Sequence, residues 1–443
     1  MNISVIGLGK LGAPLAAVFA RKGHTVLGVD MDTRPVRLIN EGKAPVFEPG
    51  LNELIQESRM RLSATTDYQA AISNTEVTFI IVPTPSDSHG GFSLRYVLMA
   101  AKSIGEALRR KDKFHLIVLT STVMPGATGS EVLPILESCS GKRCGSDFGL
   151  CYNPEFIALG SAIRDMLNPD FILIGESDSR SGEKLMTLQK GVCDNDPPVT
   201  RMNFINSELT KLAVNTFVTT KISYANMLAG MCERLPGADV DIVTSALGLD
   251  SRIGNKYLKG ALGYGGPCFP RDNIAFAQLA RRLGSQAVLA EATDRLNRMQ
   301  IPRLAEIILA RLPHDGKVGI LGLAYKPNTD VVEEAQGMEL ARYLISRGVS
   351  LVLYDPAALE NARISLDGEM TFASSLEECT RHADVVVITT PWDEFRRLSP
   401  DILNYSNGRP TLVDCWRMLS REDYEPSVSY VALGIGLKPD ESR

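Results

Sequence analysis

The chain has 443 residues, 44% hydrophobic and 22% charged, which is the balance of a globular protein rather than a disordered or fibrous one. This length exceeds one ordinary hydrophobic core and predicts two or three domains. A net charge of −5 gives no electrostatic case for nucleic acid or an anionic membrane as a partner, and no apolar run approaches the roughly 20 residues that span a bilayer.

The start of the chain and its cysteines bear on location and redox state. The first residues, MNISVIGLG, run into an apolar strand without a basic region or a cleavable segment, so we expect a cytoplasmic protein. Eight cysteines scattered through so long a chain favour reduced thiols over a disulfide framework. None of the five histidines lies near a cysteine pair at zinc-ligand spacing, so the sequence predicts no metal site.

The first elements predict a dinucleotide site. Residues 3–6 form an apolar strand, a glycine-rich turn and a helix to Gly23 follow, and a second strand ends at Asp30. The glycines allow a tight turn and the close approach of a pyrophosphate, which the helix start then faces. Asp30 would accept hydrogen bonds from ribose hydroxyls and repel a 2′-phosphate, favouring NAD over NADP. A glycine-rich turn of another α/β protein is the alternative. The predicted cofactor residues are Gly7, Leu8, Gly9, Lys10, Leu11, Gly12 and Asp30.

Three later apolar stretches, 77–85, 114–126 and 148–156, read as further strands of the same sheet, and this α/β region ends near residue 200. Ligands of open parallel sheets bind at the carboxyl ends of strands, so Thr84, Pro85 and Thr122 are predicted to line the nicotinamide side. Capping or turn formation is the alternative for the threonines. Glu155 ends the third strand, where a general acid/base role and a solvent-facing role are both open.

From about residue 203 the pattern becomes helical. The stretch FINSELTKLAVNTFVTTKISYANMLAGMCERL contains no glycine or proline before Gly230, and we expect this long helix to pack against a second copy of the chain. Lys211 and Asn215 share one of its faces, although such a polar pair is usually only solvated. A second helix is predicted at 237–249 and a third helical stretch through about 312.

Between them lies the loop Gly263 to Asp272, GYGGPCFPRD. Its glycines let backbone approach a ligand closely, and a thiol at Cys268 with a carboxylate at Asp272 suits covalent catalysis on a carbonyl. The alternative is a buried, inert cysteine beside a turn. From 317 strands and helices alternate again, which predicts a second parallel sheet. We therefore predict three domains: 1–200, an NAD-binding Rossmann domain; 201–312, a helical dimerisation domain; and 313–443, a second Rossmann-like domain.

Together these stretches resemble the UDP-glucose/GDP-mannose dehydrogenase family over nearly the whole length. The motifs that carry the resemblance are the glycine-rich turn at 7–12, EPGL (48–51), TP (84–85), STV (121–123), NPEF (153–156), Lys211 with Asn215, RIG (252–254), GYGGPCFPRD and KPNTD (326–330). The resemblance implies oxidation of C6 of a nucleotide sugar from alcohol to carboxylate with two NAD, and a homodimer built on the long helix.

The resemblance also implies residue roles. Cys268 would attack the C6 aldehyde, Lys211 would stabilise the oxyanion, and Asn215 would hold the C6 oxygen. Glu155 and Asp272 would handle protons or water, which Thr122 would help orient, and Arg252 would reach the substrate of the partner copy. The implied substrate contacts are Glu155, Phe156, Lys211, Asn215, Arg252, Tyr257, Leu258, Gly263, Gly265, Gly266 and Lys326.

The chain departs from the family pattern away from these residues. Leu159 stands where the family usually has an acid, Val331 and Glu333 replace the Asp and Arg that commonly follow KPNTD, and Cys415-Trp416-Arg417 replaces Gly-Arg after Asp414. The sequence leaves the sugar open among UDP-glucose, UDP-N-acetylhexosamines and GDP-mannose. Two further alternatives are a two-electron dehydrogenase of the hydroxyacid type, against which Cys268 and residues 317–443 count, and a non-catalytic nucleotide-binding member.

Overall fold

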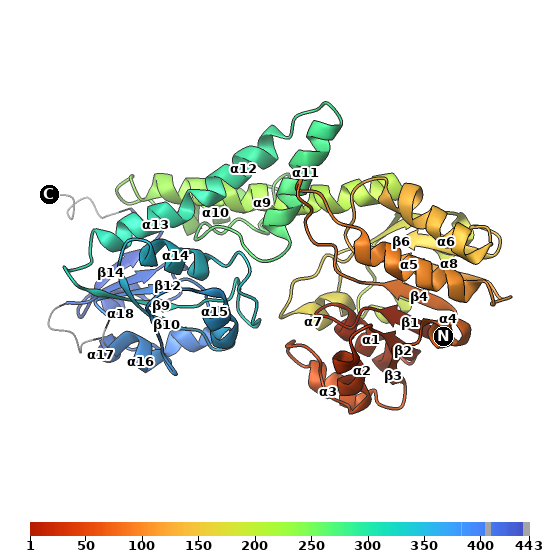
Figure 1. Cartoon of the computed structure of the whole chain (residues 1–443). Coiled ribbons are helices and arrows are strands. Elements are labelled where there is room, and N and C mark those ends of the chain that lie inside the picture. Colours follow the sequence, from red (N-terminus) through yellow and green to blue (C-terminus); the bar gives the residue numbers. More distant parts are fainter. Residues whose placement is uncertain (382, 404–408, 437–443) are drawn as a thin grey trace. The chain divides into compact units, whose positions relative to one another are not determined.

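The structure, a computed structural model, describes residues 1–381, 383–403 and 409–436. It divides into two compact units, Met1–Ala213 and Val214–Arg443. The division falls inside the long helix α9 (Phe204–Cys232), so that one continuous helix supplies residues to both units (Figure 1).

The first unit is built on an eight-stranded sheet with the strand order β3-β2-β1-β4-β5-β6-β7-β8. Neighbouring strands are parallel except for the antiparallel pair β6–β7. The strands are β1 (Asn2–Ile6), β2 (Thr25–Val29), β3 (Leu62–Thr65), β4 (Val77–Ile80), β5 (His115–Leu119), β6 (Phe148–Tyr152), β7 (Ile172–Glu176) and β8 (Val199–Met202).

Helices cover both faces of this sheet (Figure 1). Alternate residues of β1 point to opposite faces: Ile3 and Val5 pack with α1, α3, α7 and α8, whereas Ile6 packs with α4, α5 and α6. The helices are α1 (Gly12–Arg21), α2 (Thr33–Asn40), α3 (Leu51–Glu57), α4 (Tyr68–Asn74), α5 (Arg95–Leu108), α6 (Leu133–Ser140), α7 (Ala162–Leu167) and α8 (Ser179–Val192), with a π-helical turn at Thr128–Val132.

The second unit contains a six-stranded, fully parallel sheet with the order β11-β10-β9-β12-β13-β14. Its strands are β9 (Lys317–Leu321), β10 (Ser350–Tyr354), β11 (Thr371–Phe372), β12 (Val385–Ile388), β13 (Thr411–Asp414) and β14 (Ser429–Ala432). Its helices are α14 (Gln336–Ile345), α15 (Leu359–Ser365), α16 (Leu376–Arg381), α17 (Pro400–Leu403) and α18 (Arg421–Tyr424), with a 3-10 turn at Asp393–Arg397.

Except for α9, the helices that lie between the two sheets in the sequence are shorter than the sequence pattern predicts. The second predicted helix is α10 (Val240–Gly248), which begins where the Asp239 carboxylate accepts hydrogen bonds from the amides of Asp241 and Ile242. The third stretch is three helices, separated in part by Gly284, whose φ of +68° ends a helix: α11 (Phe269–Arg282), α12 (Val288–Arg298) and α13 (Gln300–Leu309).

The segment after β14 returns to α9 and α10. Gly434 donates its amide to the Glu233 carboxylate at 2.7 Å, and its carbonyl accepts from Val240 at 3.0 Å. Arg417 pairs with both carboxylate oxygens of Asp241 at 2.8 Å, which lowers the pKa of Asp241. The last described residues of the second unit are therefore tied to the start of its helical part.

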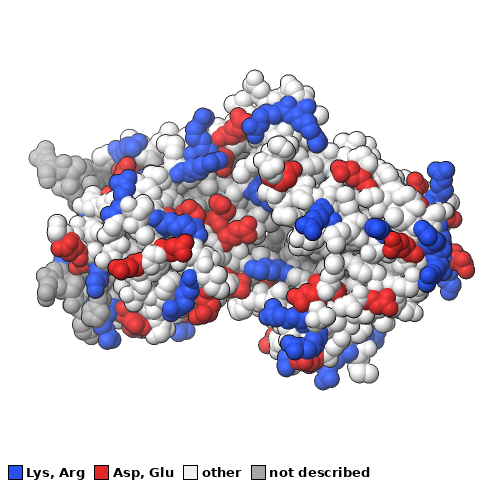
Figure 2. All heavy atoms as spheres, viewed as in Figure 1, with Lys and Arg blue, Asp and Glu red and all other residues white. Residues whose placement is uncertain are grey.

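The predicted fold class is confirmed: two parallel-sheet α/β parts with helices between them, including one long helix. Across the described residues no helix is both long and apolar enough to cross a bilayer. On the face drawn in Figure 2, basic and acidic side chains are interspersed over each unit, without a large surface of one sign.

Candidate active site

The glycine-rich turn after β1 has the packing that a dinucleotide requires. Gly7 has a φ of +97°, and a Cβ atom at Gly12 would lie 1.9 Å from the Gly7 carbonyl oxygen, so neither position accepts a side chain. At Gly9 a Cβ would meet nothing within 4 Å, which leaves that side of the turn open for a pyrophosphate. The Asp30 carboxylate accepts from the Asp32 amide at 2.9 Å and, at 2.8 Å, from the amide of Leu8, which precedes Gly9 in the turn. Of the other predicted residues of the turn, Lys10 is exposed and Leu11 is half-buried.

A similar glycine turn follows β9 in the second unit, but the acid beside it has different hydrogen-bond partners. Gly322 has a φ of +107° and donates to the Tyr354 carbonyl at 2.8 Å, as Gly7 donates to Val29 at 2.7 Å. Asp355, which corresponds to Asp30, is 1% exposed. Five protein donors occupy its carboxylate: the amides of Leu323, Ala324, Ala357 and Ala358 and the indole of Trp392. The first turn thus has an acid that a ribose can reach, and the second has one that is used internally.

The ends of β4 and β5 are joined by hydroxyl groups. Thr84 donates to the Thr122 carbonyl at 2.8 Å, and the Ser121 hydroxyl exchanges hydrogen bonds with both backbone groups of Val82 at 2.6 and 2.9 Å. Pro85 follows Thr84 in the same loop, beyond the end of β4 at Ile80. The structure therefore brings the predicted residues Thr84, Pro85 and Thr122 to one edge of the first sheet.

Glu155 lies beyond the strand rather than on it. β6 ends at Tyr152 because Pro154 has no amide hydrogen, and the chain turns toward α9. There the Lys211 ammonium donates to the Glu155 carbonyl at 2.7 Å and lies 4.6 Å from the centre of the Phe156 ring. Burial raises the pKa of the Glu155 carboxyl to about 7, against the opposing positive charge of Lys211.

Two glutamates that sequence reasoning gave no role hold these loops. Glu48, in the EPGL motif, accepts from the amides of Gly160 and Ala162, each at 2.7 Å, just after the NPEF segment. Glu208 on α9 accepts from Gly126 at 2.5 Å and Thr128 at 2.8 Å, just after Thr122, and burial raises its pKa. Glu48 could have been flagged from its motif, whereas Glu208 carries no signal in the sequence.

In the second unit, Cys268 is exposed and immediately precedes α11, whereas the other seven cysteines, all within the described residues, are buried or half-buried. Asp272, one turn into α11, is 1% exposed. Its carboxylate accepts from the Asn215 side chain at 2.6 Å and from Arg271 at 3.3 Å. This buried pair therefore joins α9, which carries Asn215, to α11, which carries Asp272 and begins just after Cys268.

The glycines before Cys268 are packed against protein. A Cβ at Gly263 would lie 2.4 Å from the Asn297 side-chain oxygen, one at Gly265 would lie 2.1 Å from the Glu334 carbonyl, and one at Gly266 would lie 2.6 Å from the Tyr325 ring. Gly266 also donates its amide to the Glu333 carbonyl at 3.1 Å. These glycines are required for close packing within the unit, whether or not they also face a substrate.

The remaining predicted substrate residues are spread over the second unit. Arg252 is exposed and pairs with Asp250 at 2.6 Å, in a loop whose carbonyls at 253 and 254 accept from Lys221. Tyr257 is exposed with a φ of +64°, Leu258 is buried, and Lys326 is half-buried.

At the departures from the family pattern, Val331 is buried, Glu333 is exposed, and the Trp416 indole donates to the Thr389 carbonyl at 2.9 Å. Arg417 is held by Asp241 and the Leu433 carbonyl, so it would have to leave both to contact a substrate. Leu159 is half-buried.

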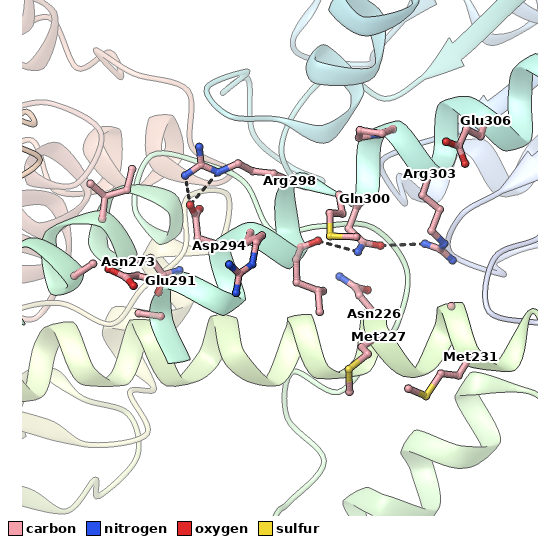
Figure 3. A pocket seen from close by; sticks show the side chains of 18 of the residues that line it. Asn226, Met227, Met231, Asn273, Glu291, Asp294, Arg298, Gln300, Arg303 and Glu306 are labelled. Atoms are coloured by element: carbon pink, nitrogen blue, oxygen red, sulfur yellow. Dashed lines mark hydrogen bonds and ion pairs between the residues drawn. The ribbon is translucent and has the colours of Figure 1, made fainter. Parts of the chain in front are cut away.

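A cavity of about 1100 Å³ lies among α9, α11, α12 and α13 of the second unit (Figure 3). It is lined by methionines and by charged side chains, among them the ion pair Asp294–Arg298. Cys268, Asn215 and Asp272 are not among its lining residues. Within the described residues no three His, Cys, Asp or Glu side chains gather as a metal ion would require.

Comparison with known proteins identifies the family to which this chain belongs. Residues 1–192, 205–299 and 319–421 match the NAD-binding, central and UDP-binding domains of the UDP-glucose/GDP-mannose dehydrogenase family. The chain is 40% identical to the UDP-glucose 6-dehydrogenase of Haloferax volcanii over 97% of this chain and 100% of that protein. It is 35% identical to the GDP-mannose 6-dehydrogenase of Pseudomonas putida, over 90% and 93% of the two chains.

A solved UDP-glucose dehydrogenase from Pyrobaculum islandicum superposes with a TM-score of 0.88 at 36% identity and covers 98% of both chains. The identities and coverage, together with an NAD-type turn in one unit and a second sheet in the other, establish the relationship. The chain therefore belongs to the UDP-glucose/GDP-mannose dehydrogenase family and is an NAD-dependent nucleotide-sugar 6-dehydrogenase.

Proposed function

We propose that this protein oxidises the C6 hydroxyl of UDP-glucose to a carboxylate in two steps, each of which transfers one hydride to an NAD. The observation that carries the proposal is Cys268, an exposed thiol at the start of α11, four residues before the buried Asp272 that the Asn215 side chain contacts. A two-electron dehydrogenase has no use for such a thiol, whereas oxidation of an aldehyde to an acid needs an added nucleophile.

The two oxidations proceed through a covalent intermediate on Cys268. The alcohol loses a hydride and a proton and becomes an aldehyde. The Cys268 sulfur adds to the aldehyde carbon, and the thiohemiacetal loses a second hydride and a proton to give a thioester. Water then cleaves the carbon–sulfur bond, which releases the acid and restores the thiol. NAD, when bound, accepts one hydride at each oxidation.

The residues of the chain divide this work. Glu155, with a pKa of about 7, can take a proton near neutral pH, because both of its forms are populated there. We propose that Lys211 supplies positive charge to the oxygen of the tetrahedral species, and that Asn215 holds that oxygen while anchored to Asp272. Asp30 receives the ribose of NAD, and the opening at Gly9 receives its pyrophosphate.

UDP-glucose is the first choice of substrate because UDP-glucose dehydrogenases are among the relatives with the highest identity. GDP-mannose is the second choice, since the Pseudomonas enzymes that act on it are 34–35% identical. The departures at Val331, Glu333 and Trp416 fall in the UDP-binding part of the family. The departure at Trp416 bears on the choice of substrate, and those at Val331 and Glu333 bear on how NAD is held.

The test is the amount of NADH released per molecule of sugar, measured with UDP-glucose, UDP-N-acetylglucosamine, UDP-N-acetylmannosamine and GDP-mannose. We expect two NADH from UDP-glucose and, in a Cys268→Ser variant, no net conversion to the acid. One NADH per sugar would identify a two-electron dehydrogenase. Undiminished acid production by Cys268→Ser would overturn the covalent mechanism, and no NADH from any sugar would indicate a non-catalytic member.

We further propose that the protein is a homodimer through α9. Phe217, Tyr224 and Met231 recur at seven-residue spacing along α9, which places them on one stripe, and they are 66%, 47% and 50% exposed. Ile242 and Leu249, at the same spacing, are 70% and 86% exposed at α10. An exposed apolar stripe of this length is typical of an interface, and a second copy offers the same stripe in return. Arg252 lies in the loop that follows α10.

A further inference from the structure

In the loop that carries Cys268, both backbone groups of Tyr264 bind one asparagine side chain. The Asn297 side-chain oxygen accepts from the Tyr264 amide at 2.8 Å, and its side-chain nitrogen donates to the Tyr264 carbonyl at 3.0 Å. Asn297 is on α12 and is buried. Because one planar amide engages both backbone groups of one residue, it restricts the dihedral angles on both sides of Tyr264.

The other contacts of Tyr264 hold it in the same place. Its hydroxyl accepts from Asn273 at 3.0 Å, and its ring meets Phe269 edge-to-face with the centroids 6.3 Å apart. Gln336 donates a third, longer bond to the Tyr264 carbonyl at 3.3 Å. Residue 264 is therefore a fixed point from which the chain runs to the thiol.

Only Gly265, Gly266 and Pro267 separate this point from Cys268. Gly266 donates to the Glu333 carbonyl at 3.1 Å, and both glycines pack against residues of the 325–334 segment with no room for a Cβ. Glycine has the greatest backbone freedom of any residue, so the position of the thiol depends on the contacts that hold residues 264–266.

We propose that Asn297 is a positioning residue for the nucleophile, acting through the backbone of Tyr264. The inference rests on the proposed function, in which only the second oxidation requires the thiol. A displaced loop should therefore slow the second hydride transfer more than the first, whereas general destabilisation of the unit would slow both alike.

The test uses Asn297→Asp, which keeps the size of the side chain but turns the donor that faces the Tyr264 carbonyl into an acceptor. The matched control is Asn40→Asp in the first unit, because the Asn40 amide makes the same two bonds to the backbone of Ala64, at 2.8 and 2.9 Å. In single-turnover experiments with UDP-glucose, we expect Asn297→Asp to slow release of the second NADH at least about tenfold, with the first within about threefold of the unsubstituted protein. Asn40→Asp should leave the ratio of the two rates unchanged.

Hydrogen exchange gives a readout that does not depend on activity. We expect the amides of residues 263–266 and 268 to exchange faster in Asn297→Asp but not in Asn40→Asp. If Asn297→Asp fails to fold, Gln336→Met removes the longer bond to the same carbonyl and should act in the same direction, to a smaller extent. An unchanged rate ratio with unchanged exchange, or equal slowing of both steps, overturns the inference. Absence of NADH from the unsubstituted protein overturns the proposed function instead, and exchange alone then decides whether Asn297 holds the loop.

Discussion

Glu155 is the residue for which the structure most clearly predicts a dependence of activity on pH. Burial moves its pKa from 4.5 to about 7, so the group is half ionised near neutrality. As a general base it works only in the ionised form. We therefore expect kcat to rise with pH through about 7, and a Glu155→Gln variant to lose that limb together with most of its activity.

The same shift predicts a change in stability. A pKa raised by folding stabilises the folded state below about pH 4.5, and this contribution is lost as pH rises through about 7. At pH 8, Glu155→Gln should therefore have a free energy of unfolding up to about 3 kcal/mol higher than that of the unsubstituted protein, measured by urea titration. At pH 4 the two proteins should have nearly equal free energies of unfolding, and an equal gain at both pH values would contradict the assignment.

Asp30 and Asp355 occupy corresponding positions in the two glycine turns, and their substitution gives a second test at the residue scale. Asp30→Ala should weaken NAD binding about tenfold or more, measured by calorimetry, because the ribose loses a charged acceptor. Asp355→Ala should leave NAD affinity unchanged but lower the free energy of unfolding by about 3 kcal/mol or more, since it strands buried donors. Reduced NAD affinity in Asp355→Ala would show that the second turn also serves the cofactor.

At the scale of elements, the sequence identified what is local and missed what is distant. The turn at 7–12, the helix α9 and the strand β9 follow from glycine spacing and apolar runs within a few residues. The predicted strands 77–85, 114–126 and 148–156 run past the observed strand ends at Ile80, Leu119 and Tyr152, because the sequence pattern does not mark where the ladder of hydrogen bonds stops. The separation of α11, α12 and α13 likewise depended on turn residues such as Gly284.

The candidate site divides in the same way. Cys268, Lys211, Asn215 and Asp272 could be named because they occur in recognisable motifs, and their roles remain predictions. The side chains that hold them could not: Glu48 contacts residues 112 and 114 positions later, and Asn297 lies 33 positions from Tyr264. A single sequence does not report which distant side chain satisfies a given backbone amide.

At the scale of the whole molecule, the exposed stripe on α9 predicts the assembly. A Phe217→Glu variant should convert a dimer of twice 48.2 kDa into monomers, because it places a charge where two apolar side chains would meet. Ile364→Glu, at a residue 84% exposed on α15, is the matched control and should stay dimeric. Mass photometry distinguishes the species, and a dimer that survives Phe217→Glu would place the interface elsewhere.

The return of the 433–436 segment to α9 and α10 has a consequence for synthesis of the chain. Gly434 binds Glu233 across 201 residues, and Arg417 binds Asp241 across 176. The first unit is complete in sequence by Ala213 and can fold while the ribosome is still translating. The second must wait for its last strand, roughly 10 to 40 s after Glu233 is made at about 5 to 20 residues per second. During that interval α10 lacks the contacts that Gly434 and Arg417 supply, so chaperones have the longest access to the half of the chain that carries the nucleophile.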